Sequence, residues 1–390
     1  MTLLARDPRA PFTLTPPVLP LERRTRGYDI PLAITALTLS LIGAVLVWAA
    51  TRDTQIAQHA NPQGFLYRHL INIAIGGVLA IVAARLDARV LRLFGPVVYL
   101  ASLFGLVLVL VAGTTVNGAK AWIRIGAGVE LQPAEFMKLG LVVGMAVLFT
   151  RHEREEGTQP RGREVLQAIA LIAVPLGLIM LQPDLGSAMV LGCAAYGVLI
   201  AAGVRARWTI GLIALGVLVA VIAIKGGILH GYQLDRFRSF TQPNRDVQGT
   251  GYNITQAHIA IANGGLFGRG LFAGPQTDGG YVPEQQTDFI FSAAGEEFGL
   301  VGGAVIIALF AFLCWRGLRI ARAADDAGKL VAVGIVCWFA FQAFQNIGMC
   351  IGLTPVTGVP LPFVSYGGSS MFAGGLAIGL LEAVHRRCPA

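Results

Sequence analysis

Long apolar runs divide the chain into about ten segments. A helix needs roughly 20 apolar residues to cross a bilayer, and each run comes close to that length. The expected fold is therefore an all-α polytopic membrane protein, a bundle of about ten transmembrane helices. The predicted spans cover approximately residues 28–50, 66–84, 93–112, 131–150, 164–182, 185–203, 208–225, 289–314, 329–351 and 363–384.

Lysine and arginine fall mostly on one side of these spans. The two terminal segments and the loops after even-numbered spans hold 20 of the 30. Because cytoplasmic loops are enriched in Lys and Arg, we expect both termini in the cytoplasm. Residues 1–27, rich in arginine and proline, predict a disordered cytoplasmic tail before a retained first span. Residues 28–390 would then form one transmembrane domain.

Composition narrows the class of protein further. The chain is 55% hydrophobic and only 13% charged, against roughly 25% charged in soluble domains. The net charge of +8 could suggest a nucleic acid partner, but the basic residues sit in short loops and not on one stripe, so none is expected. The five cysteines show no metal-ligand spacing and predict packed free thiols.

Short polar motifs recur at the ends of the spans that face away from the basic loops. They are 117–119 with Trp122, 132–135, 182–184, 286–288 and 365–369. We expect every ionisable cluster between the spans on this outward face. A transporter would place its polar groups near the middle of the bilayer, so the pattern favours a protein that acts at the outer surface.

Two outward segments are unusual. The outer loop between spans seven and eight covers about 226–288, and a polar connection of that length is generally functional. Within it, 255–261 predict a short helix at the membrane interface. Residues 353–362 contain three prolines and cannot form a regular helix. We expect irregular backbone there, folded into the outer side of the bundle as a cavity wall.

Five ionisable residues in or beside the spans are candidate site residues. Glu135 and Lys138 are three apart, so they share a helix face and can pair, and an ammonium inside an apolar span is costly. Asp184 has a simple alternative as a helix N-cap. For Glu296 and Glu297, adjacent within a span, a structural and a functional role both stay open.

The chain resembles the SEDS family of bacterial cell-wall polymerases from its first span to its last. The motifs that carry the resemblance are 182–186, 251–256, 283–291 and 295–297. Residues 346–349 and 358–362 are more similar to the elongation branch, RodA, than to the division branch, FtsW. Two positions depart from many relatives: Gln286 replaces a histidine and Ala134 a serine.

The resemblance implies a peptidoglycan glycosyltransferase that polymerises lipid II at the outer face of the cytoplasmic membrane, for cell elongation and shape. Asp288 would be the essential acidic residue of the site, whose carboxylate acts as the general base that deprotonates the acceptor hydroxyl. Cations must stabilise the negative charge that develops on the diphosphate leaving group. Lys138 and Arg236 are the first candidates for this role, and Lys120 and Arg124 are the second. The residues expected to bind substrate are Trp122, Glu135, Lys138, Asp184, Arg236, Ser365 and Ser369.

The resemblance also implies partners. Lipid II, the nascent glycan strand and a class B penicillin-binding protein, the transpeptidase, are expected. A divalent cation, Mg²⁺ or Mn²⁺, could share the task of binding diphosphate, although the sequence shows no dedicated ligand cluster. Two alternatives to the enzyme are a lipid II flippase and a scaffold that only positions the transpeptidase.

Overall fold

The computed structural model describes residues 26–116, 119–126, 129–151, 159–225 and 249–388. These ranges contain twelve helices and three short strands. The predicted disordered tail (apart from residues 26 and 27), Arg236 and the first part of the long outer loop lie outside them.

Ten of the helices coincide with the ten predicted spans. They are α1 (Ile30–Ala57), α2 (Gly64–Ala84), α3 (Ala88–Ala112), α4 (Pro133–Phe149), α5 (Gly162–Leu181), α6 (Leu185–Ala201), α7 (Ala206–Lys225), α11 (Ile290–Ala323), α12 (Asp326–Cys350) and α13 (Gly368–Arg387). Six of the described helices are long and apolar enough to cross a membrane by length and composition, and α6 and part of α7 are shorter apolar helices. The chain is a polytopic membrane protein, as predicted.

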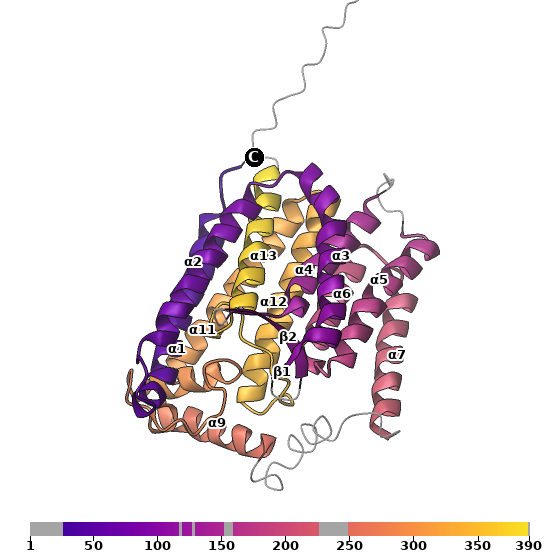
Figure 1. The fold of residues 1–390 in the computed structure, drawn as a ribbon. Helices are drawn as coiled ribbons and strands as arrows, with labels where there is room; N and C mark the ends of the chain where they lie inside the picture. The colour runs from indigo at the N-terminus through magenta and orange to yellow at the C-terminus, as the bar shows by residue number, and fades with distance from the viewer. Residues whose placement is uncertain (1–25, 117–118, 127–128, 152–158, 226–248, 389–390) are drawn as a thin grey trace, which may run out of the picture.

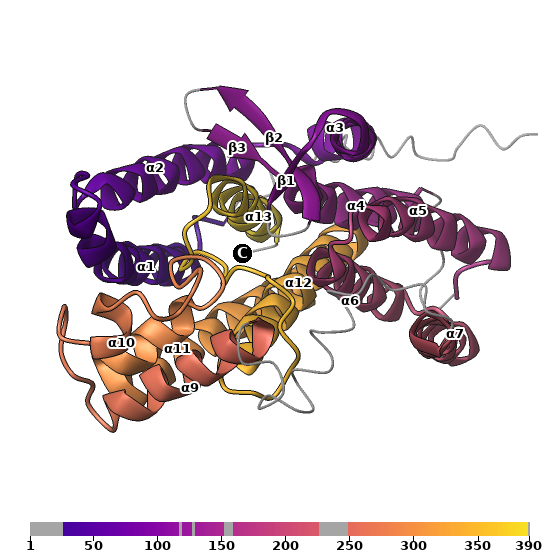
Figure 2. The ribbon, with the colours of Figure 1, turned by 60° about the horizontal axis from the view of Figure 1, so that its bottom comes forward.

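The helices form one bundle with α12 and α13 at its centre (Figures 1 and 2). Helices α1 and α2 lie on one side, and α7 lies at the opposite margin. Small residues allow the closest approaches: a Cβ on Gly375 of α13 would meet the carbonyl oxygen of Gly76 on α2 at 2.2 Å. Such contacts are how helices pack within a membrane, where no hydrophobic force drives them together. All five cysteines are free thiols, as predicted.

The described ends of the chain meet at one end of the bundle. The backbone N–H of Arg26 donates to the carbonyl of Arg386 at 3.1 Å, and the upper end of α13 lies far from α9 (Thr250–Gly264) in Figure 1. An even number of crossings requires this arrangement, which agrees with the predicted shared side of the two termini.

A small antiparallel sheet, not anticipated from the sequence, lies between α3 and α4. Its strands are β1 (Thr114–Val116), β2 (Ala119–Gly126) and β3 (Val129–Leu131), in the order β1-β2-β3. Short strands such as these carry little sequence signal between long apolar runs. The sheet lies at the end of the bundle that Figure 2 brings forward, opposite the termini.

The described part of the outer loop contains α9 and α10 (Pro275–Asp278). The helix predicted at 255–261 is therefore confirmed and is longer than expected. Glu296 makes the contacts expected of a structural role: its carboxylate accepts the backbone N–H groups of Gln276 (3.0 Å) and Thr277 (2.7 Å). The carboxylate of Glu297 likewise accepts the N–H of Phe272 at 2.9 Å.

A break in α11 provides further contacts between this helix and the outer loop. Gly299 adopts a φ of 66°, which interrupts the helix two residues after Glu297. The N–H groups of Leu300 and Val301 then donate to the carbonyls of Gly265 and Leu266 at 2.9 and 3.1 Å. The loop therefore satisfies backbone groups that the broken helix leaves without an intrahelical partner.

Candidate active site

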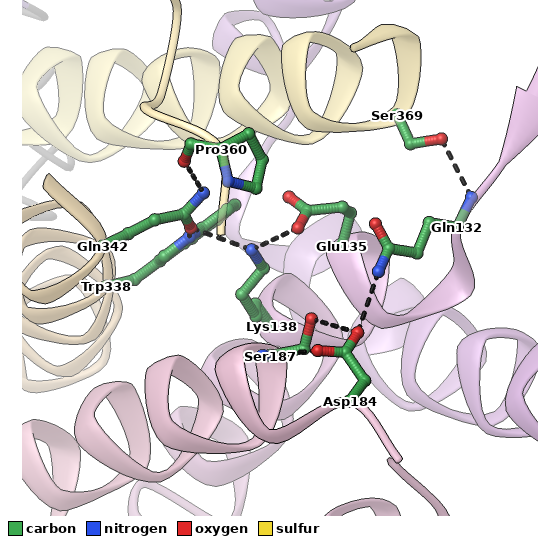
Figure 3. A network of polar contacts seen from close by, with 9 residues as sticks. All are labelled: Gln132, Glu135, Lys138, Asp184, Ser187, Trp338, Gln342, Pro360 and Ser369. Atoms are coloured by element: carbon green, nitrogen blue, oxygen red, sulfur yellow. Dashed lines mark hydrogen bonds and ion pairs between the residues drawn. The ribbon is translucent and has the colours of Figure 1, made fainter. Parts of the chain in front are cut away.

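A network of polar side chains joins α4, α6, α12 and α13 at the end of the bundle opposite the termini (Figure 3). Its central residue is Lys138, whose side chain is 1% exposed. The ammonium contacts Glu135 Oε1 at 2.7 Å and Gln342 Oε1 at 2.9 Å. The predicted pair of Glu135 and Lys138 is thus present, and burial away from water makes the pairing necessary for Lys138 to remain charged.

Two residues of α12 that the sequence analysis did not select complete the surroundings of Lys138. The ammonium lies 4.7 Å from the centre of the Trp338 ring. The indole N–H of Trp338 donates to Gln342 Oε1 at 2.5 Å, and Gln342 Nε2 donates to the carbonyl of Pro360 at 2.8 Å. A tryptophan followed four residues later by glutamine places both on one helix face, which was the available signal.

Asp184 has the N-cap role that the simpler interpretation gave it. Its carboxylate accepts the N–H and the hydroxyl of Ser187 at 2.9 and 2.7 Å, at the start of α6. It also accepts the side-chain amide of Gln132 at 3.0 Å. The residue therefore caps a helix and, at the same time, joins the network through Gln132.

Asp288 lies two residues before α11 begins, and its side chain is half-buried. The side-chain amide of Asn346 donates to the Asp288 carbonyl and to the Val359 carbonyl, each at 2.8 Å. Asn346 is one turn after Gln342 on α12. One face of α12 therefore positions both Lys138 and the backbone of Asp288, and it also ties down the irregular segment at 359 and 360.

Ser365 and Ser369 are buried and bond to backbone. The amide of Leu361 donates to Ser365 Oγ at 2.8 Å, and Ser365 Oγ itself donates to the carbonyl of Thr287. Ser369 Oγ accepts the N–H of Gln132 at 2.9 Å. Their contact with a substrate stays a prediction, but both hydroxyls fix the segments that carry Asp288 and Glu135.

The other candidate cations and the candidate tryptophan lie on the small sheet. Lys120 donates to the carbonyl of Leu110 at 2.8 Å, at the end of α3, and Arg124 pairs with Glu130 at 2.9 Å. Trp122 is half-buried on β2. Lys120 and Arg124 make these contacts outside the network and Arg236 lies outside the described residues, so Lys138 is the candidate cation that the described structure brings into the network.

Several acceptors at this end are buried without a hydrogen bond to any described residue. They are Glu135 Oε2, Gln182 Oε1 and Asn346 Oδ1. Buried polar atoms are nearly always paired with protein or water, so these acceptors are available to a water or a polar ligand. Within the described ranges no group of three or more His, Cys, Asp or Glu residues could hold a metal ion.

One feature of the charge distribution was predicted wrongly. The charge pattern of the sequence predicted every ionisable cluster at the outward ends of the spans. The structure contains a second cluster at the opposite end, where Arg316 pairs with Asp29 and Glu382 accepts the N–H of Asp29 at 2.8 Å. Asp29 and Glu382 fall inside the predicted spans 28–50 and 363–384, but they are 353 positions apart, so the sequence did not show that they lie together.

Comparisons with known proteins identify the family of the chain. The FtsW, RodA and SpoVE family model, described as a cell cycle protein, matches residues 30–388. The chain is 37% identical to the probable peptidoglycan glycosyltransferase FtsW of Coxiella burnetii, over 91% of this chain and 95% of the relative. It is 36% identical to the stage V sporulation protein E of Bacillus subtilis, over 92% and 97%.

Solved structures are also similar. A chain from a peptidoglycan synthase complex, described as coordinating polymerization and crosslinking, superposes with a TM-score of 0.75 and 32% identity, over 92% of this chain and 98% of that one. The rod shape determining protein RodA of Thermus thermophilus gives a TM-score of 0.67 at 29% identity, over 92% and 97%.

Proposed function

The chain belongs to the FtsW, RodA and SpoVE family of cell cycle proteins, and we propose that it is a peptidoglycan glycosyltransferase that polymerises lipid II into glycan strands. The observation that carries the proposal is the face of α12 on which Gln342 positions Lys138 and Asn346 positions Asp288. Glycosyl transfer between lipid-linked sugars requires a base and a cation, and this face supports one of each.

In the proposed reaction, Asp288 takes the proton from the 4-hydroxyl of the acceptor lipid II. The hydroxyl oxygen forms a bond to the anomeric carbon of the growing chain, while the bond from that carbon to the diphosphate breaks. The electron pair leaves with the diphosphate, so negative charge develops on its oxygens. Lys138, and Arg236 from the outer loop, stabilise that charge electrostatically.

Burial gives Lys138 an advantage in this role. A fixed ammonium excluded from water interacts more strongly with developing charge than a solvated one, and it need not reorganise during the reaction. Glu135 and Gln342 hold the ammonium in place, and the uncommitted Glu135 Oε2 leaves an acceptor for a hydroxyl or water.

We place the active site on the outer face of the cytoplasmic membrane. The basic loops and both described termini lie at the other end of the bundle, and cytoplasmic loops carry the excess of Lys and Arg. A class B penicillin-binding protein is the proposed partner. The similarity to a chain of a peptidoglycan synthase complex supports this pairing.

The proposed function is tested with the purified protein in detergent, alone and with its transpeptidase partner, given labelled lipid II. We expect glycan chains that lysozyme digests. A flippase would instead move labelled lipid II between the leaflets of a vesicle without making polymer, and a scaffold would do neither. Either result would overturn the glycosyltransferase assignment.

A further inference from the structure

The second ionisable cluster joins three helices at the end of the bundle that holds the termini. Asp29 caps α1 and is 2% exposed. Its carboxylate accepts N–H groups from Arg316 near the end of α11, with Nε to Oδ1 at 3.2 Å. Glu382 of α13 accepts the Asp29 backbone N–H at 2.8 Å. These contacts lie far from the proposed reaction and have no part in it.

A cavity of about 330 Å³ opens beside this cluster, large enough for a phosphate with its attached glycerol. Its lining residues come from the segment before α1, which ends at the N-cap Asp29, and from α11 and α13, and they are Arg26, Asp29, Arg316, Arg319, Ile320, Ala323 and His385. Three arginines and one aspartate give the lining a net charge of +2 with His385 neutral. The cavity is therefore suited to an anion.

Arg319 is the arginine most available to a ligand. Its side chain is exposed, and its recorded contact is with the Trp315 ring, 5.7 Å from the guanidinium carbon. Among the described residues it has no carboxylate partner, whereas Arg316 is committed to Asp29. A guanidinium presents paired N–H donors that match two oxygens of a phosphate group.

Aromatic residues beside the cavity indicate its depth in the membrane. Trp315 is 50% exposed and Tyr28 is 48% exposed, and the guanidinium of Arg386 lies 4.8 Å from the Tyr28 ring. Trp and Tyr concentrate at the level of lipid headgroups. Ile30 and Leu318, exposed at 63% and 41%, provide apolar surface nearby for acyl chains.

We propose that this cavity binds the phosphate group of an anionic phospholipid headgroup. The phosphate bridges Arg26, in the segment before α1, and Arg319 on α11, and the acyl chains follow the exposed apolar side chains of α1 and α11. Basic pockets between transmembrane helices on the positive side are suited to such headgroups. The bound lipid thereby stabilises the junction of α1, α11 and α13, independently of the polymerase assignment.

The test measures the melting temperature of the full-length protein in neutral detergent. Phosphatidylglycerol, phosphatidylcholine or inorganic phosphate is added over a range of concentrations. A ligand that binds only the folded state raises the melting temperature as its concentration exceeds the dissociation constant. We expect a rise with phosphatidylglycerol and little change with the zwitterionic lipid or with inorganic phosphate.

Arg319→Gln should remove most of the rise, and Arg26→Gln should do the same. The matched control is Arg322→Gln, one turn further along α11 and outside the cavity lining, which should keep the rise. Equal rises in Arg319→Gln and Arg322→Gln, or in both lipids, would overturn the proposal. A full Arg319-dependent rise with inorganic phosphate alone would overturn the lipid as the source of the phosphate.

Discussion

At the scale of single residues, Lys138 is the clearest candidate for a functional role, because burying its charge in an apolar helix costs free energy. Its ammonium is buried in an apolar helix and depends on Glu135 and Gln342. Removing one partner of a buried ion pair leaves the charge of the other uncompensated, which typically lowers the stability of the fold by about 3–5 kcal/mol. The pair is therefore strongly coupled.

Lys138→Met should lower the polymerisation rate and the melting temperature, because it removes the cation and leaves Glu135 unpaired. Glu135→Gln in the same background should add less than its own separate penalty, since the two residues form one pair. The rates and melting temperatures of both single variants and the double variant check this. Lys329→Met is the control, because Lys329 lies in the first turn of α12, far from Gln342 and the buried pair. Strictly additive losses would contradict a shared role.

Asn346 and Gln345 allow a positioning effect to be separated from stability. Both are buried amides that hold backbone carbonyls of the irregular segment, but only Asn346 also holds Asp288. Each change to alanine should destabilise the fold by roughly 1–3 kcal/mol. Asn346→Ala should in addition lower the rate of polymerisation by about 10²-fold, because small misplacements of a catalytic group are costly. Equal rates in the two variants would refute the positioning role.

The sequence was informative about some of these residues and not about others. Glu135 and Lys138 were recognisable as a pair for two reasons. A charge within an apolar span is costly unless it is paired, and residues three apart lie on the same helix face. Gln342 and Asn346 were not selected, since neutral amides in a helix are common and their partners are carbonyls distant in sequence. Asp29 and Arg316 are 287 positions apart, so only the fold brings them together.

At the scale of elements, the break in α11 determines how the outer loop is attached. A Cβ at Gly299 would meet the backbone nitrogen of Gly268 at 2.3 Å, and the positive φ is itself costly for other residues. The carbonyls of residues 265 and 266 depend on this break for their partners. The break could not be predicted, because a single glycine in an apolar helix is ordinary.

Gly299→Ala should therefore detach the segment from 263 to 278 and lower the melting temperature. Limited proteolysis, read by mass spectrometry, should show faster cleavage within that segment. Gly192→Ala on α6 is the control, since a Cβ there meets nothing within 4 Å, and alanine is favoured over glycine in helices. An unchanged cleavage pattern in Gly299→Ala would show that the break does not hold the loop.

At the scale of the whole molecule, the length of the apolar runs alone located all ten long helices. The length and hydrophobicity of a span depend on local sequence, which is why they were predictable. The small sheet, the loop attachment and the cluster around Asp29 depend on contacts between distant segments. The assignment to cell elongation rather than division stays a prediction, because it rests on residues 346–349 and 358–362 alone.

Depletion of the protein in its own cells distinguishes the two cellular roles. We expect the cells to become round, because loss of polymerisation along the side wall stops elongation while septation continues. Microscopy after depletion, with incorporation of a fluorescent cell-wall precursor, records this outcome. Long filaments without septa would instead assign the protein to division.

The most direct test concerns Asp288, the proposed base. Asp288→Asn keeps the shape of the side chain and the backbone contact with Asn346 but removes the base, so polymerisation of labelled lipid II should fall about 10²–10⁴-fold. The melting temperature and co-purification with the transpeptidase should remain unchanged, which shows that the variant is folded. Glycan synthesis by Asp288→Asn at close to the unaltered rate would contradict the proposed mechanism.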